Sequence, residues 1–81
     1  MLKLPSQPVE GDGWSVWDCD PSKFNWHYES KELAYLFKGR VKVRTREEMV
    51  EIKAGDFVTF PAGLSCSWEV LERVEKVYKF E

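Results

Sequence analysis

The chain has 81 residues, of which 12 are Lys or Arg and 14 are Asp or Glu, so its formal charge is −2. A chain of this length forms one small domain that buries only roughly 60–65% of its unfolded surface, so its 15% of aromatic residues predict a dense aromatic core. Acidic and basic residues are interleaved, which argues against the concentrated basic field that nucleic-acid binding requires. We therefore expect no nucleic-acid partner.

The sequence carries no sign of a membrane or secretory segment. No run approaches the ~18 apolar residues of a membrane helix, and residues 1–13 lack the apolar centre of a signal peptide. We therefore expect a cytoplasmic protein without a membrane partner. Its two cysteines, Cys19 and Cys66, do not form a CxxC pair, and both should be free thiols in a reducing compartment.

The first half of the chain predicts an arm followed by two strands. Residues 1–13 contain two prolines and two glycines and should form an N-terminal arm without regular structure, while residues 14–81 form the domain. Alternation then places Trp14 and Val16 on one face of a first strand. It places Phe24, Trp26 and Tyr28 on one face of a second, and residues 18–23 form the loop between them.

The second half predicts a series of short strands and turns. Residues 32–37 and 41–45 read as a hairpin with its turn at Lys38–Gly39, and residues 46–48 read as a charged turn into a strand at 49–52. Gly55 should adopt a positive φ in the next turn, and Pro61 should end a strand at 57–60. Residues 66–70 and 74–80 read as strands. An amphipathic helix over residues 67–80 is the competing interpretation, which we disfavour because valines and aromatic residues prefer strands. Seven or eight short strands predict an all-β sandwich or barrel.

Two glycine-containing motifs suggest a family. Glu32 is followed after six residues by Gly39, and "GDFVTFPAG" at residues 55–63 follows fifteen residues later. With this spacing the sequence resembles a small single-domain cupin, an RmlC-like jelly roll, over nearly the whole chain. More narrowly, it resembles the group related to (S)-ureidoglycine aminohydrolase cupin domains. The resemblance implies a small antiparallel β-barrel, also called a double-stranded β-helix.

The resemblance also identifies the positions at which metal-binding cupins carry their ligands. Two histidines would stand at Trp26 and Tyr28, a glutamate at Glu32 and a third histidine at Cys66, so only the carboxylate is retained. His27, the single histidine, falls on the opposite face by alternation. We therefore expect no cofactor; a divalent metal such as Mn, Zn or Ni is the alternative.

The same alignment implies a ligand site inside the barrel. It turns five side chains inward: Trp26, Tyr28, Glu32, Cys66 and Trp68. An inward ionised Glu32 is costly unless it reaches water, meets a hydrogen-bond donor or takes up a proton. For Cys66 the pattern offers no histidine or cation in phase, so a neutral buried thiol is expected rather than a nucleophile.

Three hypotheses of function follow. The first is a cupin-fold module that binds a small molecule in an aromatic pocket containing Glu32 and Cys66. The second is a metal-assisted enzyme resembling ureidoglycine aminohydrolase, and the third is a structural or interaction domain with a filled barrel. Whether any reaction is catalysed stays open. Because cupins commonly form dimers, we also expect a homodimer that covers Tyr35 and Phe37 together with the N-terminal arm.

Overall fold

All regular secondary structure is β-strand in the computed structural model of the chain, which describes residues 2–4 and 13–81. The strands are β1 (Leu2–Leu4), β2 (Ser15–Cys19), β3 (Ser22–His27), β4 (Glu32–Arg44), β5 (Met49–Lys53), β6 (Phe57–Phe60) and β7 (Ser65–Phe80). The all-β jelly-roll prediction is confirmed, and the helical interpretation of residues 67–80 is excluded. Within these described ranges no helix could cross a membrane.

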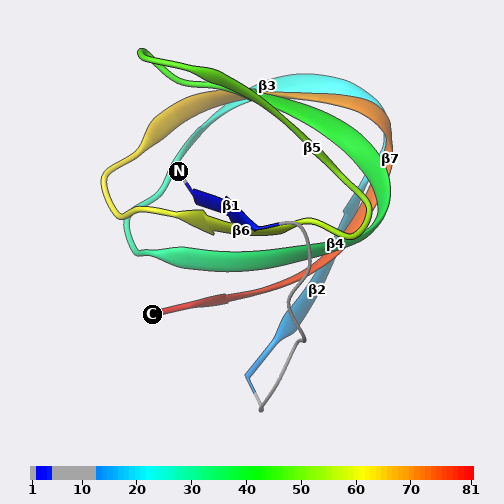
Figure 1. Cartoon of the computed structure of the whole chain (residues 1–81), viewed down its shortest axis with the longest axis horizontal. Helices are drawn as coiled ribbons and strands as arrows, with labels where there is room; N and C mark the ends of the chain where they lie inside the picture. The colour runs from blue at the N-terminus through cyan, green and yellow to red at the C-terminus, as the bar shows by residue number, and fades with distance from the viewer. Residues whose placement is uncertain (1, 5–12) are drawn as a thin grey trace.

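Two long strands, β4 and β7, form the frame of the barrel. They pair with each other in antiparallel orientation over most of their length, from Glu32 opposite Phe80 to Arg44 opposite Ser67. The sheet runs in the order β1-β6-β4-β7-β2, while β5 adds to β4 and β3 adds to β7. Figure 1 shows both long strands curling around one central space, so each contributes to both halves of the barrel.

A β-bulge lies at Lys38–Gly39, where a hairpin turn was predicted, so that prediction is wrong. β4 continues through this point, and its register with β7 shifts between Leu36 and Val41. Gly39 has φ 95°, and a Cβ there would lie 2.2 Å from the backbone carbonyl oxygen of Arg73. The extra residue inverts the alternation, so that Leu36 before it and Val41 after it are both buried although they are an odd number of positions apart.

Three other boundaries differ from the predictions. The loop at 18–23 is shorter than predicted, because β2 continues to Cys19 and β3 begins at Ser22. The two strands predicted at 66–70 and 74–80 are one continuous strand, β7. Part of the predicted arm is also a strand, since β1 pairs with β6 through Leu2 opposite Thr59. The remainder of the arm prediction, at residues 1 and 5–12, lies outside the described residues.

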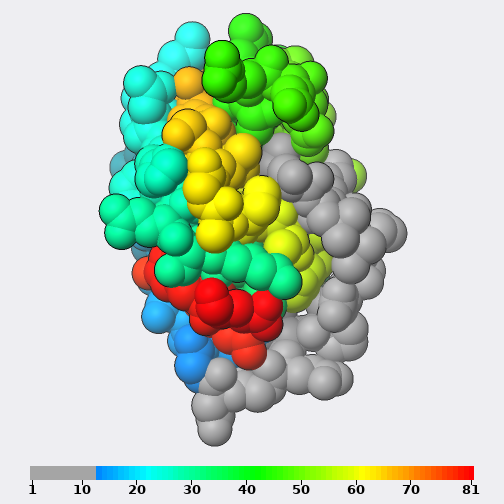
Figure 2. All heavy atoms as spheres, turned by 90° about the vertical axis from the view of Figure 1, so that its left-hand side faces the viewer, coloured from blue at the N-terminus to red at the C-terminus, as the bar shows by residue number. Residues whose placement is uncertain are grey.

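Apolar side chains fill the core of the barrel, and the turn between β6 and β7 is hydrogen-bonded to the residue that follows β3. Fully buried residues come from both halves of the barrel, among them Leu36, Ile52, Val58 and Phe60. The turn after Pro61, as predicted, ends β6, and its Leu64 carbonyl accepts a hydrogen bond from the Tyr28 backbone N–H at 2.8 Å. Figure 2 shows this segment, in yellow, lying beside the start of β4, with the end of β7, in red, on the other side of that strand. The β3–β4 connection and the β6–β7 turn are thereby fixed against each other.

Candidate functional site

A buried ion pair lies inside the barrel. Lys76 on β7 donates a hydrogen bond from Nζ to Glu32 Oε2 on β4 at 2.9 Å, and the two side chains are only 7% and 5% exposed. Glu32 reaches the amine diagonally, because Lys76 pairs with Leu36, two inward positions further along β4. The carboxylate of Glu32, which the sequence predicted to point inward, therefore accepts a hydrogen bond from the ammonium group of Lys76.

Aromatic rings surround the Lys76 ammonium group. Nζ lies between 4.8 and 6.0 Å from the ring centroids of Trp68, Trp17, Tyr78 and Phe60. These distances allow the negative ring faces to attract the cation and to replace part of the water it has lost. Burial nevertheless lowers the pKa of Lys76, and the neighbouring carboxylate opposes that shift. The amine is thus less strongly basic than a lysine in water.

A cavity of about 370 Å³ opens beside the ion pair. Seven of its ten lining residues are aromatic, and the other three are Cys19, Glu32 and Lys76. Trp26 also lines it but is 51% exposed, so this indole stands at the mouth. The cavity therefore combines an apolar wall with one pair of opposite charges. This volume lies at the lower end of the roughly 300–1,000 Å³ found for small-molecule sites.

Trp68, one of the residues that line the cavity, carries a buried polar atom without a partner among the described residues. Trp68 is 3% exposed, and its indole Nε1 has no hydrogen-bond acceptor among the described residues. The indole ring is held firmly, because Phe24 stacks on it with 6.0 Å between ring centroids and Phe60 lies 5.8 Å away. Leaving a buried N–H unbonded costs about 1–3 kcal/mol, so an acceptor supplied by a bound molecule would relieve a real penalty.

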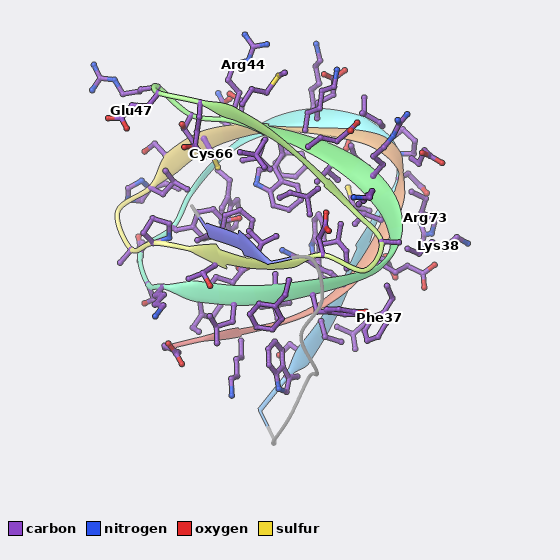
Figure 3. The ribbon with its side chains drawn as sticks, viewed as in Figure 1. Phe37, Lys38, Arg44, Glu47, Cys66 and Arg73 are labelled. Carbon is purple, nitrogen blue, oxygen red and sulfur yellow. The ribbon has the colours of Figure 1, made fainter. Side chains whose placement is uncertain are left out.

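Tyr28 forms part of this wall, whereas Cys66 is buried without lining the cavity. Tyr28 is 2% exposed and stacks on Phe60 at 4.7 Å between centroids; burial, with a smaller contribution from Glu32, raises its pKa. Burial likewise raises the pKa of the Cys66 thiol. The Trp68 indole opposes both shifts without forming a hydrogen bond of good geometry to either group. Cys66 points into the barrel in Figure 3, while Arg44 and Glu47 point away from it. The thiol is therefore neutral, which does not suit a nucleophile.

The residues predicted from the resemblance fall into two groups. Glu32, Tyr28 and Trp68 are buried and line the cavity, with Trp26 at its mouth, whereas Cys66 is buried but is not among the lining residues. His27 lies on the outer face, as alternation predicts, and its Nδ1 is 2.8 Å from the hydroxyl of Ser65 across the β3–β7 pair. This histidine is thus turned away from the cavity.

Sequence reasoning missed Lys76 and Trp17. A signal for Lys76 was present, because Cys66, Trp68, Val70 and Val74 share one phase of β7 and the next inward position is 76. For Trp17 the signal was ambiguous, since the segment "WSVW" has apolar residues in both phases. The structure turns Val16 outward, with 77% exposure, and Trp17 inward. The alternation that grouped Trp14 with Val16 did not show that their face is the outer one.

Comparison with known proteins identifies the family. A family model described as a EutQ-like cupin domain matches residues 7–78. The chain belongs to the EutQ-like cupin family. No curated protein sequence matches the chain.

Solved structures of related proteins agree with this assignment. This EutQ-like cupin is similar to a DUF861 family protein of Thermotoga maritima, with 42% identity and a TM-score of 0.82 over 84% of this chain and 78% of that one. It is similar to a protein of Salmonella typhimurium LT2 described as ethanolamine utilization protein Q, with 26% identity and a TM-score of 0.73 over 80% of this chain and 53% of that one. A EutQ protein of Clostridium difficile, at 17% identity and a TM-score of 0.74 over 80% of this chain and 52% of that one, shows the same fold. The chain thus spans about half the length of these two EutQ proteins.

The donor set of this EutQ-like cupin does not fit the metal site of metal-binding cupins. Indole, phenol and thiol groups stand at the three positions implied for histidine, and the carboxylate of Glu32 is already bonded to an ammonium group. Among residues 2–4 and 13–81 no three His, Cys, Asp or Glu side chains cluster as metal ligands. Zinc sites usually take three or four such ligands. The site's chemistry therefore rests on the Glu32–Lys76 pair.

Proposed function

We propose that this cupin binds a small, neutral, largely apolar organic molecule in the barrel cavity, without a tightly held metal. The observation that carries the proposal is the largely aromatic cavity of about 370 Å³, whose wall includes Trp68 with its unpartnered Nε1. A ligand with an aromatic or aliphatic body and one hydrogen-bond acceptor would fill the space and satisfy this N–H.

The charge balance of the cavity favours a neutral ligand. Glu32 and Lys76 neutralise each other at 2.9 Å, so neither is available to balance a second charge. A charged ligand would lose its hydration on entering without gaining a counter-ion, which is costly in an apolar environment. A neutral molecule avoids that cost.

The other two hypotheses receive less support. A filled barrel is at odds with a cavity of this volume. Metal-assisted deamination, which the resemblance to ureidoglycine aminohydrolase would imply, needs ligands at positions occupied here by Trp26, Tyr28 and Cys66. Binding without such a metal is therefore the function we adopt.

A pair of matched ligands tests the proposal. Benzyl alcohol carries an acceptor on an aromatic ring, and toluene has a similar shape without one. Titration of benzyl alcohol into the ¹⁵N-labelled protein should shift the indole N–H resonance of Trp68 and leave that of Trp14, which packs on Phe57 outside the cavity, unchanged. In Trp68→Phe, benzyl alcohol should bind about 2- to 10-fold more weakly, the loss of one hydrogen bond, while toluene binding changes less.

Trp14→Phe serves as the control and should retain full affinity for benzyl alcohol. The proposal is contradicted if millimolar benzyl alcohol shifts neither indole resonance, or if both indoles respond equally.

We also propose that the protein forms a homodimer through the outer face that β2, β7 and β4 share. Val16, Val77 and Tyr35 lie directly opposite one another on β2, β7 and β4, so they share that face. Phe37, 58% exposed, extends the row and contacts the Tyr35 ring edge-to-face at 4.9 Å; Figure 3 shows it outside the barrel wall. A second copy covering this row would remove an exposed apolar patch from water.

A further inference from the structure

Lys76 combines burial with access to the cavity. It is the one buried lysine among residues 13–81. By contrast, four other lysine side chains that form ion pairs are 49–77% exposed: Lys23, Lys31, Lys38 and Lys53. A primary amine in an apolar cavity, beside a carboxylate that can exchange protons with it, is the arrangement that allows a lysine to act as a nucleophile toward carbonyl carbon.

We propose that Lys76 binds aldehydes covalently and reversibly as an iminium, with Glu32 carrying the protons. This inference rests on the small-molecule function proposed above, and it adds the chemical class of the ligand and the bond that holds it.

The reaction begins with a proton transfer inside the ion pair. The hydrogen bond of 2.9 Å between Nζ and Glu32 Oε2 lets the ammonium group give one proton to the carboxylate. The resulting amine attacks the aldehyde carbon through its lone pair, so a C–N bond forms and the C=O π electrons move to oxygen. With one proton moved from nitrogen to that oxygen through Glu32, the product is a neutral carbinolamine.

Loss of water completes the bond. The protonated Glu32 gives its proton to the carbinolamine hydroxyl, which leaves as water while the nitrogen lone pair forms C=N. In sum, one ammonium group and one aldehyde give one iminium ion and one water, and Glu32 ends ionised as it began. Hydrolysis is the same sequence in reverse, so binding requires no further reactant.

The cavity suits the product as well as the reactants. An iminium keeps the single positive charge of Lys76, so Glu32 retains its counter-ion and the aromatic rings at 4.8–6.0 Å still face a cation. The new substituent extends into the space beside Nζ, where the wall is largely aromatic. Burial, which lowers the pKa of Lys76, also increases the fraction of amine at neutral pH. Bond formation therefore adds apolar contact without creating an unpaired charge.

Reductive trapping with benzaldehyde tests the inference on the whole protein. Sodium cyanoborohydride reduces an iminium to a stable secondary amine, so each trapped lysine gains one benzyl group. At neutral pH and equimolar benzaldehyde, peptide mass mapping of the wild-type protein should find the benzyl group mainly on Lys76, at least 10-fold above any other lysine. Mapping the wild-type chain avoids dependence on a variant that fails to fold.

Two variants provide the comparison. Lys76→Arg keeps the charge but cannot form an iminium, and should lose the dominant label. Lys79→Arg changes a neighbouring lysine whose Nζ lies 5.0 Å from the Trp14 ring, away from the cavity, and should keep that label on Lys76. Benzyl label spread over the exposed lysines, with Lys76 unmodified, would overturn the inference.

Benzyl alcohol separates the two proposals, because it can bind but cannot form an iminium. If it shifts the Trp68 resonance while Lys76 remains unlabelled by benzaldehyde, the covalent inference is wrong and the binding function stands. If benzyl alcohol does not bind and Lys76 is not labelled, both are wrong.

Discussion

The strength of coupling between Glu32 and Lys76 is the most direct test of the site's electrostatics. Their charged atoms are 2.9 Å apart, and at an effective dielectric constant of about 20 this separation gives an attraction of about 6 kcal/mol. Removing both charges from water costs several kcal/mol per ion, so the pair as a whole adds little net stability. Removing one partner alone should be strongly destabilising, because the other stays buried and unpaired.

A double-mutant cycle gives the expected values. Glu32→Leu and Lys76→Met should each lower the free energy of unfolding by about 3–5 kcal/mol, whereas the double variant should lie close to the wild type or above it. Urea unfolding followed by tryptophan fluorescence measures all four proteins. The surface pair Lys38–Glu75, at 3.8 Å with side chains 67% and 46% exposed, is the matched control and should couple by at most about 1 kcal/mol.

The result that would refute this reasoning is a coupling energy in the buried pair no larger than that of the surface pair. Such a value would mean that water reaches both charges in solution. A coupling energy of the buried pair that disappeared in 1 M salt would lead to the same conclusion, because only exposed charges are screened strongly.

Three further predictions concern the bulge, the buried phenol and the outer face. Gly39→Ala should lower the free energy of unfolding in urea by at least about 2 kcal/mol more than Gly55→Ala, because both glycines have φ 95° but only Gly39 has a backbone carbonyl within 4 Å of its Cβ position. Burial raises the pKa of Tyr28 above the ordinary 10.0, so the unfolded chain releases this proton first. The contribution of the neutral phenol to the free energy of unfolding is therefore complete below pH 10 and decreases above it. Relative to Tyr28→Phe, the wild type should lose about 1.4 kcal/mol of this free energy per pH unit above pH 10. Light scattering should give twice the 9.5 kDa chain mass for wild type and for Met49→Glu, an exposed control on β5, but the monomer mass for Phe37→Glu; a monomeric wild type would contradict the dimer.

The fold could be predicted because its signals are local. Turns depend on the conformation of single residues, here Gly55 and Pro61. The motif from Glu32 to Gly39 is likewise contained in one short segment. Both turn residues lie where the sequence placed them, and the spacing between the motifs indicated the cupin barrel that the family comparison shows.

The bulge could not be predicted in this way, because two backbone structures can account for a break in the alternation of buried and exposed residues. Leu36 and Val41 are both buried, five positions apart, so strict alternation has to fail between them. A chain reversal at Gly39 and a bulge at Gly39 both restore it, and both use a glycine with positive φ. Only the partner strand decides between them, and β7 pairs with β4 on both sides of the bulge. That information is distant in sequence.

Lys76 was missed because the resemblance directs attention to positions where metal-binding cupins carry ligands, and this residue is at none of them. A carboxylate inside an aromatic barrel needs a positive partner. In metal-binding relatives that partner would be a metal ion held by histidines; here Lys76, bonded to Glu32 at 2.9 Å, supplies it from within the chain. A tethered ammonium group needs no ligands of its own, so the positions implied for histidine are free to become the indole, phenol and thiol that the structure contains. The change of cation also changes the available chemistry, since a metal ion polarises oxygen whereas an amine can form a bond to carbon. The absence of histidine at these positions and the buried lysine beside Glu32 are therefore two consistent features of one site.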